Sequence, residues 1–299
     1  MRTPVIEIQN LTRDYGQGRG VFDLSFAVEP GEVFGFLGPN GAGKTTTIRH
    51  LMGFIKPRAG RVRLFGQDCF AHAGELHRQV GYLPGELALP EELTGAGMIR
   101  FTAGLRGWKD TRDADELARL LELDPRQPIR RMSKGTKQKV GLVCALMGEP
   151  KLLILDEPTS GLDPLMQSRF VELIGRARAR GATVLLSSHL FEEVERTCTR
   201  AAVLRAGRLA AVQTMEQLRR SKSRRYVFTF ADPETAAAAA ARWPDARAEG
   251  VRLTARVQGG ESLPALLALG AEYGARDLET HGLTLEESFY QYYEKEARQ

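Results

Sequence analysis

The sequence is poor in cysteine and has no long apolar run. Its three cysteines, Cys69, Cys144 and Cys198, are odd in number and lack metal-ligand spacing, so we expect buried thiols in a reducing compartment. No uninterrupted apolar stretch reaches the roughly 18 residues that a helix needs to cross a bilayer. The first residues contain no apolar signal region. We therefore expect neither a secretion signal nor a membrane span.

The remaining composition is that of an ordinary globular protein. Hydrophobic residues make up 42% and charged residues 26% of 299 residues, a length that suits two domains. The net charge of +5 is spread along the chain and is compatible with a nucleotide site or a membrane surface. Composition alone does not distinguish these two.

A glycine-rich stretch lies between the apolar run 32–37 and a segment of helical character at 46–52. Its spacing, G-x-x-x-x-G-K-T, is typical of loops that surround the phosphates of a nucleoside triphosphate. Glycines let backbone N–H groups converge, and the following helix dipole favours an anion. Lys44 adds charge for the outer phosphates, and the Thr45 hydroxyl is placed to bind Mg²⁺. The candidate loop residues are Gly38, Pro39, Asn40, Gly41, Ala42, Gly43, Lys44, Thr45 and Thr46.

Tyr15 lies in a loop between two expected strands, 5–8 and 21–28. It could be a core aromatic residue or it could stack on a purine base. Its place in a loop favours stacking, because an aromatic face accepts any base.

Two carboxylates follow the aliphatic run 152–155. Four aliphatic residues in succession predict a strand buried on both faces, hence a parallel central sheet. Ligands bind at the carboxyl ends of such strands. We expect Asp156 to hold Mg²⁺ through water and Glu157 to orient or deprotonate the attacking water.

Two further residues have both a structural and a functional interpretation. Asp163 followed by Pro164 suits the start of a helix, so capping alone could explain Asp163. His189 follows the expected strand 183–186 and could reach a bound γ-phosphate, although a lone histidine is usually structural.

The order of expected elements indicates two domains. Helices are expected within 94–147, inserted between strands, in a nucleotide-binding domain covering 1–220. The basic run 219–225 predicts a solvated linker, with binding to anionic lipid headgroups as the alternative. Residues 221–299 predict a small β-α-β-β-α-β domain of ferredoxin-like type. A capping box at 284–287 predicts a terminal helix with Leu285, Phe289 and Tyr292 on one face.

The ordered motifs resemble those of ATP-binding cassette (ABC) ATPases over residues 3–215. The family is α/β, a P-loop fold with a mostly parallel core sheet, antiparallel N-terminal strands and a helical insertion. Two cassettes of that family dimerise head to tail and enclose two ATP molecules. The resemblance implies that Glu157 is the general base, His189 the γ-phosphate sensor and Asp163 a link across the dimer interface. The signature loop would comprise Ser133, Lys134, Gly135 and Thr136, with Ser133 and Gly135 contacting ATP of the partner.

The sequence departs from the family pattern at two places. The usual signature is Leu-Ser-Gly-Gly-Gln, whereas Lys134 and Thr136 replace a glycine and the glutamine here. This Ser-Lys-Gly form is similar to that of cassettes serving ABC-2-type exporters. Gly85 occupies the position of a family glutamine that touches Mg²⁺ and the attacking water and couples the site to the transmembrane partner. We hypothesise that Glu86, one residue later, takes over this role.

The resemblance implies an ATPase that uses ATP and Mg²⁺ and drives a separately encoded membrane permease, and the direction it implies is export. The expected partners are that permease and a second cassette, a homodimer, with no nucleic acid. The expected location is the cytoplasm, peripheral to the cell membrane. One alternative is a soluble cassette ATPase that acts on nucleic acid or ribosomes. Another is a nucleotide-gated switch with slow turnover, suggested by Gly85.

Overall fold

The computed structural model describes residues 3–108, 111–220, 224–244, 246–257 and 263–282. The chain divides into two compact units, Met1–Gln213 and Thr214–Gln299. The first unit holds all the candidate site residues.

An antiparallel sheet opens the first unit, with strand order β2-β1-β4-β5. Its strand β1 continues past Ile8, the last residue of the alternating apolar pattern in the sequence. The alternation stops there because register shifts interrupt the pairing of β1 with β2 and β4. Asn10 has φ +50° at this irregularity, and its side-chain amide donates to Asp23 at 2.8 Å. The strands are β1 (Ile6–Asp14), β2 (Gly20–Val28), β4 (Ala59–Leu64) and β5 (Gln67–Asp68).

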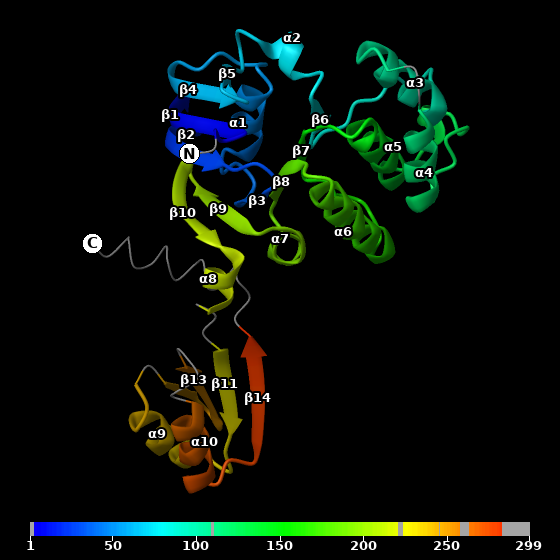
Figure 1. The fold of residues 1–299 in the computed structure, drawn as a ribbon. Helices are drawn as coiled ribbons and strands as arrows, with labels where there is room; N and C mark the ends of the chain where they lie inside the picture. Colours follow the sequence, from blue (N-terminus) through cyan, green and yellow to red (C-terminus); the bar gives the residue numbers. More distant parts are fainter. Residues whose placement is uncertain (1–2, 109–110, 221–223, 245, 258–262, 283–299) are drawn as a thin grey trace. The chain divides into compact units, whose positions relative to one another are not determined.

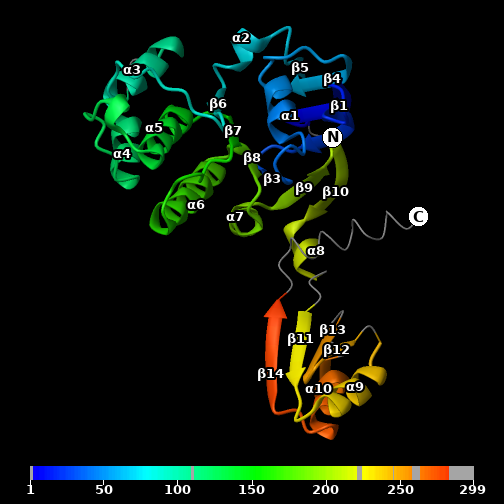
Figure 2. The same cartoon turned by 180° about the vertical axis from the view of Figure 1, so that it is seen from behind.

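A six-stranded sheet in the order β10-β9-β3-β8-β7-β6 forms the centre of this unit (Figure 2). The neighbours from β9 to β6 pair in parallel, which confirms the prediction of a parallel central sheet. Every residue of β3, β7 and β8 is buried, which explains the apolar runs in these strands. The strands are β3 (Val33–Leu37), β6 (Val80–Leu83), β7 (Leu152–Asp156), β8 (Thr183–Ser188), β9 (Arg200–Arg205) and β10 (Arg208–Thr214).

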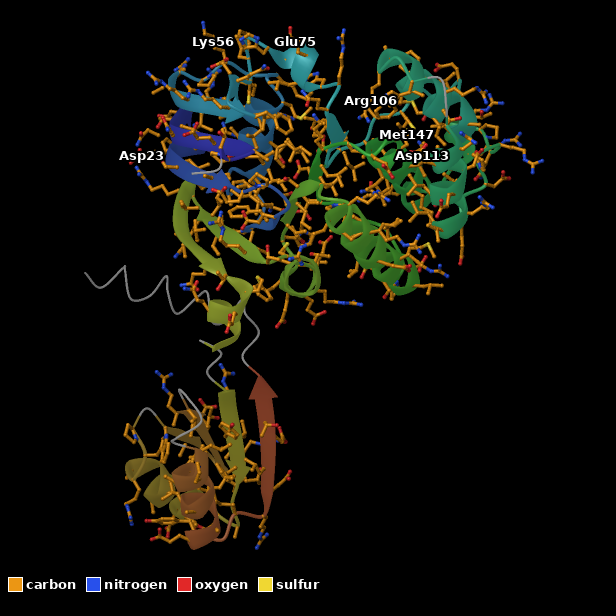
Figure 3. All side chains as sticks on the ribbon, viewed as in Figure 1. Asp23, Lys56, Glu75, Arg106, Asp113 and Met147 are labelled. Carbon is orange, nitrogen blue, oxygen red and sulfur yellow. The ribbon has the colours of Figure 1, made fainter. Side chains whose placement is uncertain are left out.

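Helices connect these strands, and three of them form the inserted helical part beyond β6 and β7 (Figure 1). Figure 3 labels Arg106 and Met147, which directly follow α3 and α5, and Asp113 in the first turn of α4. The Asp113 carboxylate accepts a hydrogen bond from the Gly148 amide and so ties α4 to the end of α5. The helices are α1 (Lys44–Leu51), α2 (Ala73–Leu76), α3 (Gly95–Leu105), α4 (Arg112–Leu120), the 3-10 helix η1 (Ile129–Arg131), α5 (Lys134–Leu146), α6 (Pro164–Ala179) and α7 (Phe191–Thr197).

The expected burial of the thiols is confirmed, since all three cysteines are free and buried. Burial raises the pKa of Cys69 and of Cys198 to about 12. Among the described residues, no helix combines the length and the apolarity that crossing a membrane requires.

The second unit has the predicted β-α-β-β-α-β order after a short helix. Its sheet is antiparallel with strand order β12-β13-β11-β14, and apolar residues of β11, β13, α9 and α10 form its core. The predicted terminal helix from Thr284 and residues 221–223 of the basic run lie outside the described residues. The elements are α8 (Met215–Arg220), β11 (Arg224–Thr229), α9 (Pro233–Ala241), β12 (Arg247–Glu249), β13 (Arg252–Val257), α10 (Leu263–Glu272) and β14 (Asp277–Gly282).

Candidate nucleotide site

The loop between β3 and α1 packs closely against its neighbours. A Cβ atom at Gly38 would lie 2.6 Å from the carbonyl oxygen of Leu204, so only glycine fits without movement. Gly43 has φ +106° and precedes α1, and no side chain caps this helix. The first N–H groups of α1 and the positive end of its dipole therefore remain directed at one place. That arrangement fits an anionic group such as a phosphate.

The Lys44 ammonium lies back over this loop. It is 5% exposed, and its Nζ donates to the carbonyl oxygen of Gly38 at 2.5 Å. The same Nζ lies 3.3 Å from Oε1 of Glu157, which follows β7. A cation next to an open helix N-terminus adds to the positive potential of the loop.

Thr45 and Asp156 form the second part of the site. The Thr45 hydroxyl donates to Oδ2 of Asp156 at 2.8 Å, and the Ser187 hydroxyl donates to its Oδ1. Asp156 is fully buried at the end of β7. A hydroxyl and a carboxylate are hard oxygen ligands of the kind that Mg²⁺ takes together with phosphates and water. The residues present thus fit a magnesium ion.

Glu157 has a backbone conformation that is uncommon for a residue other than glycine, with φ +50°. Its N–H donates to the carbonyl oxygen of Ser187 at 3.2 Å, and its carbonyl oxygen accepts from Gln138 at 3.3 Å. Its carboxylate lies between Lys44 and His189, with Oε2 2.5 Å from Nδ1 of His189. Strain of this kind persists where the surroundings fix it, often at functional sites.

The carboxyl ends of three parallel strands thus bring five predicted site residues together. β3 leads to Lys44 and Thr45, β7 to Asp156 and Glu157, and β8 to His189. Because adjacent parallel strands end at the same edge, residues more than a hundred positions apart in the sequence meet there.

Gly85 lies directly against Asp156. A Cβ atom at Gly85 would lie 3.1 Å from Oδ2 and 3.2 Å from Cγ of Asp156. Glu86 is the next residue and is exposed. In the loop after β6, it is therefore the backbone of Gly85 that lies close to Asp156, the proposed metal ligand.

The signature loop packs against the turn after β7 in the same chain. Ser133 caps α5 by accepting from the Thr136 amide at 3.1 Å. Lys134 Nζ donates to the Ser160 hydroxyl at 3.0 Å, and a Cβ atom at Gly135 would lie 2.5 Å from the carbonyl oxygen of Gly161. Among the described residues, no hydrogen bond or ion pair joins this loop to Lys44 or Thr45.

The last two predicted residues lie on separate loops. Asp163 caps α6 by accepting from the Met166 amide at 3.0 Å, so its structural interpretation is confirmed. Tyr15 is 46% exposed under the guanidinium of Arg13, which excludes the core alternative. Its aromatic ring is accessible to a stacking partner.

Sequence reasoning missed three polar residues that support this site. Gln138, Ser187 and Glu193 are buried, and they contact Glu157, Asp156 and Ser188 respectively. What distinguishes these residues is a polar side chain at a buried position, and a position is known to be buried only once the fold is known.

Known proteins that resemble this chain in sequence come from one family. The sequence model of the family described as "ABC transporter" matches residues 21–160. The bacitracin transport ATP-binding protein BcrA of Bacillus licheniformis is 33% identical over 235 residues, which cover 78% of this chain and 77% of that protein. The Nod factor export ATP-binding protein I of Ralstonia nicotianae is 35% identical over 214 residues, 70% of this chain and 67% of that protein.

A solved structure of an ATP-binding subunit of an ABC transporter has the same fold. It is 36% identical, with a TM-score of 0.68, and the match covers 72% of this chain and 92% of that one. Sequence, fold and the arrangement of the phosphate loop lead to one conclusion. This chain belongs to the family of ABC transporter ATP-binding proteins.

Proposed function

We propose that this chain binds Mg-ATP, pairs with a second cassette and hydrolyses ATP to drive a separately encoded membrane permease. The observation that carries the proposal is the convergence of Lys44, Glu157 and His189 beside the Thr45–Asp156 pair. The groups that this chain itself would use to hold a triphosphate and to activate water lie at one edge of the central sheet.

In the proposed complex, the loop Gly38–Thr46 holds the phosphates through its N–H groups, and Lys44 exchanges its contact with the Gly38 carbonyl for a phosphate oxygen. Thr45 and Asp156 would hold Mg²⁺, which neutralises the charge that develops on the phosphates. The accessible ring of Tyr15 would stack on the adenine.

Glu157 is the proposed general base. It takes one proton from a water molecule as the water oxygen bonds to the γ-phosphorus, and ADP leaves with the electrons of the broken bond. His189 holds the Glu157 carboxylate through Nδ1 and has its other ring nitrogen for the γ-phosphate. Hydrogen bonds from Ser187 and Gln138 hold the backbone of Glu157 and so limit the movement of this base.

A second cassette would complete the site. The signature residues Ser133–Thr136 are the N-cap and the first turn of α5, and this helix N-terminus would bind an anion. ATP on a partner would supply the anion, and Asp163 would lie near the dimer interface. We infer a homodimer, since one chain carries both halves.

The proposed permease is a separate protein, and the proposed direction is export. Two relatives are named for bacitracin transport and for Nod factor export, and the Ser-Lys-Gly signature of 133–135 supports the same direction. The chain would then act at the cytoplasmic face of the membrane.

Glu86 is the proposed replacement for the missing glutamine at Gly85. The support is proximity in the chain, because the Gly85 backbone lies against Asp156 and Glu86 comes next. Replacing Glu86 by alanine should lower both the ATPase rate and transport. If both stay unchanged, Glu86 does not have this role.

The ATPase proposal is tested by comparing the wild type with Glu157→Gln, using Glu192→Gln as an exposed control. Loss of the base should lower kcat about 100-fold or more, while the control keeps the wild-type rate. A wild type no faster than Glu157→Gln would instead indicate a nucleotide-gated switch.

The partner is tested by capture of the full chain from detergent-solubilised membranes in the presence of ATP. The proposal expects an integral membrane protein in stoichiometric amount. Recovery of ribosomes or DNA without an integral membrane protein would overturn it and support the nucleic-acid alternative.

A further inference from the structure

The hairpin that carries Tyr15 lies directly against the phosphate loop. Tyr15 sits in the turn between β1 and β2, where its N–H donates to the carbonyl oxygen of Arg19 at 2.9 Å, one residue before β2 begins. On the side of the phosphate loop, a Cβ atom at Gly43 would lie 3.1 Å from the carbonyl oxygen of Gly20 and 2.8 Å from Cγ1 of Val21. The start of β2 therefore packs on the residue that precedes α1, with little room for a side chain between them.

Gly207, in the turn between β9 and β10, joins these two parts through its backbone. Its N–H donates to the carbonyl oxygen of Ala42 in the phosphate loop at 3.0 Å, and its carbonyl oxygen accepts from the Phe22 amide in β2 at 2.7 Å. Gly207 is itself buried. Because buried backbone hydrogen bonds are directional and costly to leave unmade, this one residue holds the phosphate loop and the Tyr15 hairpin at a set spacing.

Only glycine fits at position 207 in this arrangement. Its φ is +77°, in the left-handed region, and a Cβ atom there would lie 2.4 Å from the carbonyl oxygen of Gly20 and 2.8 Å from Cδ2 of Phe22. The three atoms nearest to this Cβ all belong to Gly20 or Phe22, and none belongs to the phosphate loop. A side chain at 207 would therefore push the hairpin away and leave the contact with Ala42 in place.

Neighbouring contacts hold this turn in position. The Arg208 guanidinium lies over the Phe22 ring, 5.5 Å from its centroid. Strand β9, which leads into the turn, pairs in parallel with β3, and β3 leads into the phosphate loop. The turn and the phosphate loop are thus anchored to the same pair of strands, whereas β1 and β2 belong to the antiparallel sheet.

We propose that Gly207 is a positioning residue that fixes the distance between the base-stacking ring of Tyr15 and the phosphate loop. A nucleoside triphosphate spans both parts, so it gains the contacts of both only when their spacing matches the ligand. Inorganic tripolyphosphate occupies the phosphate loop alone and gains nothing from this spacing. Gly207 thereby favours nucleoside triphosphates over free polyphosphates.

This inference rests on the proposed nucleotide site. Its test measures binding to the purified full chain by isothermal titration without magnesium, so that ATP is not turned over. The ligands are ATP and inorganic tripolyphosphate, and the variants are Gly207→Ala, Tyr15→Ala and the two combined. Gly181→Ala is the matched control, because Gly181 also has a left-handed φ, +91°, but no atom of the described residues lies within 4 Å of its new Cβ. Thermal unfolding of each variant serves as the check on folding.

We expect Gly207→Ala to raise the Kd for ATP about tenfold, the size of a lost base–aromatic stack, and to change the Kd for tripolyphosphate less than about twofold. Tyr15→Ala should raise the Kd for ATP by a similar factor. Adding Gly207→Ala to Tyr15→Ala should raise it less than about twofold further, because the ring that Gly207 positions is already gone. Gly181→Ala should bind both ligands as the wild type does.

Equal losses for ATP and tripolyphosphate would overturn the inference, as would a wild-type affinity of Gly207→Ala for ATP or losses that multiply in the combined variant. If Gly207→Ala does not fold, Gly207→Asn decides in comparison with Gly181→Asn, because asparagine adopts a left-handed φ at lower cost and keeps the Cβ. A failure of the proposed nucleotide site is distinguishable, because the wild type would then bind no ATP, or Tyr15→Ala would bind it as tightly as the wild type.

Discussion

Replacing Glu193 by glutamine is expected to make the stability of the first unit less dependent on pH. Glutamine keeps the size and the hydrogen-bonding capacity of the neutral carboxyl group but cannot ionise. The side chain is nearly inaccessible to water, so solvent screening is small. Any difference in pH dependence between the two proteins therefore reports the ionisation of Glu193.

The sign and size follow from the raised pKa. In the unfolded chain the carboxyl ionises near its ordinary value of 4.5, whereas in the folded chain its pKa is about 7. Between these values the unfolded state releases a proton that the folded state keeps, so the wild type loses stability as pH rises. Linkage gives a loss of about 2–3 kcal/mol between pH 5 and pH 8. The glutamine variant lacks this loss and should become more stable than the wild type at alkaline pH.

The assay is guanidinium unfolding of both proteins at about pH 5, 6, 7 and 8, followed by far-UV circular dichroism, with the free energy of unfolding taken from midpoint and slope. Other titrating groups contribute equally to both proteins and cancel in the difference. Glu192→Gln should run parallel to the wild type. A difference between Glu193→Gln and the wild type that is the same at pH 5 and pH 8 would refute the raised pKa.

Three further predictions concern packing, thiols and the signature loop. Gly35→Ala should destabilise the fold by about 1–3 kcal/mol, since its Cβ would lie 2.5 Å from a methyl carbon of Val194. Gly175→Ala, in a helix with no atom within 4 Å of the new Cβ, should instead stabilise it by about 0.5–1 kcal/mol in the same unfolding assay. A thiol reagent such as Ellman's should label the native chain slowly and the denatured chain fully, at Cys69, Cys144 and Cys198. Lys134→Ala should leave the unfolding midpoint unchanged, because this contact is exposed, and should raise KM for ATP if the loop binds a partner's phosphate.

The elements that the sequence predicts well are those with strong local signals. Asp163 followed by Pro164 marks the start of α6, and the aliphatic run 152–155 marks β7. The spacing of the phosphate loop identifies a site because backbone N–H groups and one lysine do most of the binding. Such signals lie within a few residues, so no knowledge of tertiary contacts is needed.

The parts that the sequence does not predict depend on contacts between distant segments. Helix α7 has seven residues, no side-chain cap and a buried glutamate, so local preferences alone do not favour it. It forms because Phe191 and Val194 pack into the core beside β3 and β8. The support that Ser187 gives to Asp156 and Glu157 likewise depends on the pairing of β7 with β8.

Gly85 illustrates why the departure from the family pattern is more than the loss of one side chain. Any Cβ at this position would press on the Asp156 carboxylate, which already accepts hydrogen bonds from Thr45 and Ser187. A glutamine placed there would bring its Cβ to 3.1 Å from Oδ2 of Asp156, so this carboxylate would have to shift by a few tenths of an ångström against the two hydroxyls that hold it. The loop after β6 can therefore respond to the nucleotide only through its backbone contact with Asp156 or through the next side chain, Glu86. A shift of Asp156 would act on the Gly85 backbone through this close contact, next to the side chain of Glu86 that we propose as the replacement.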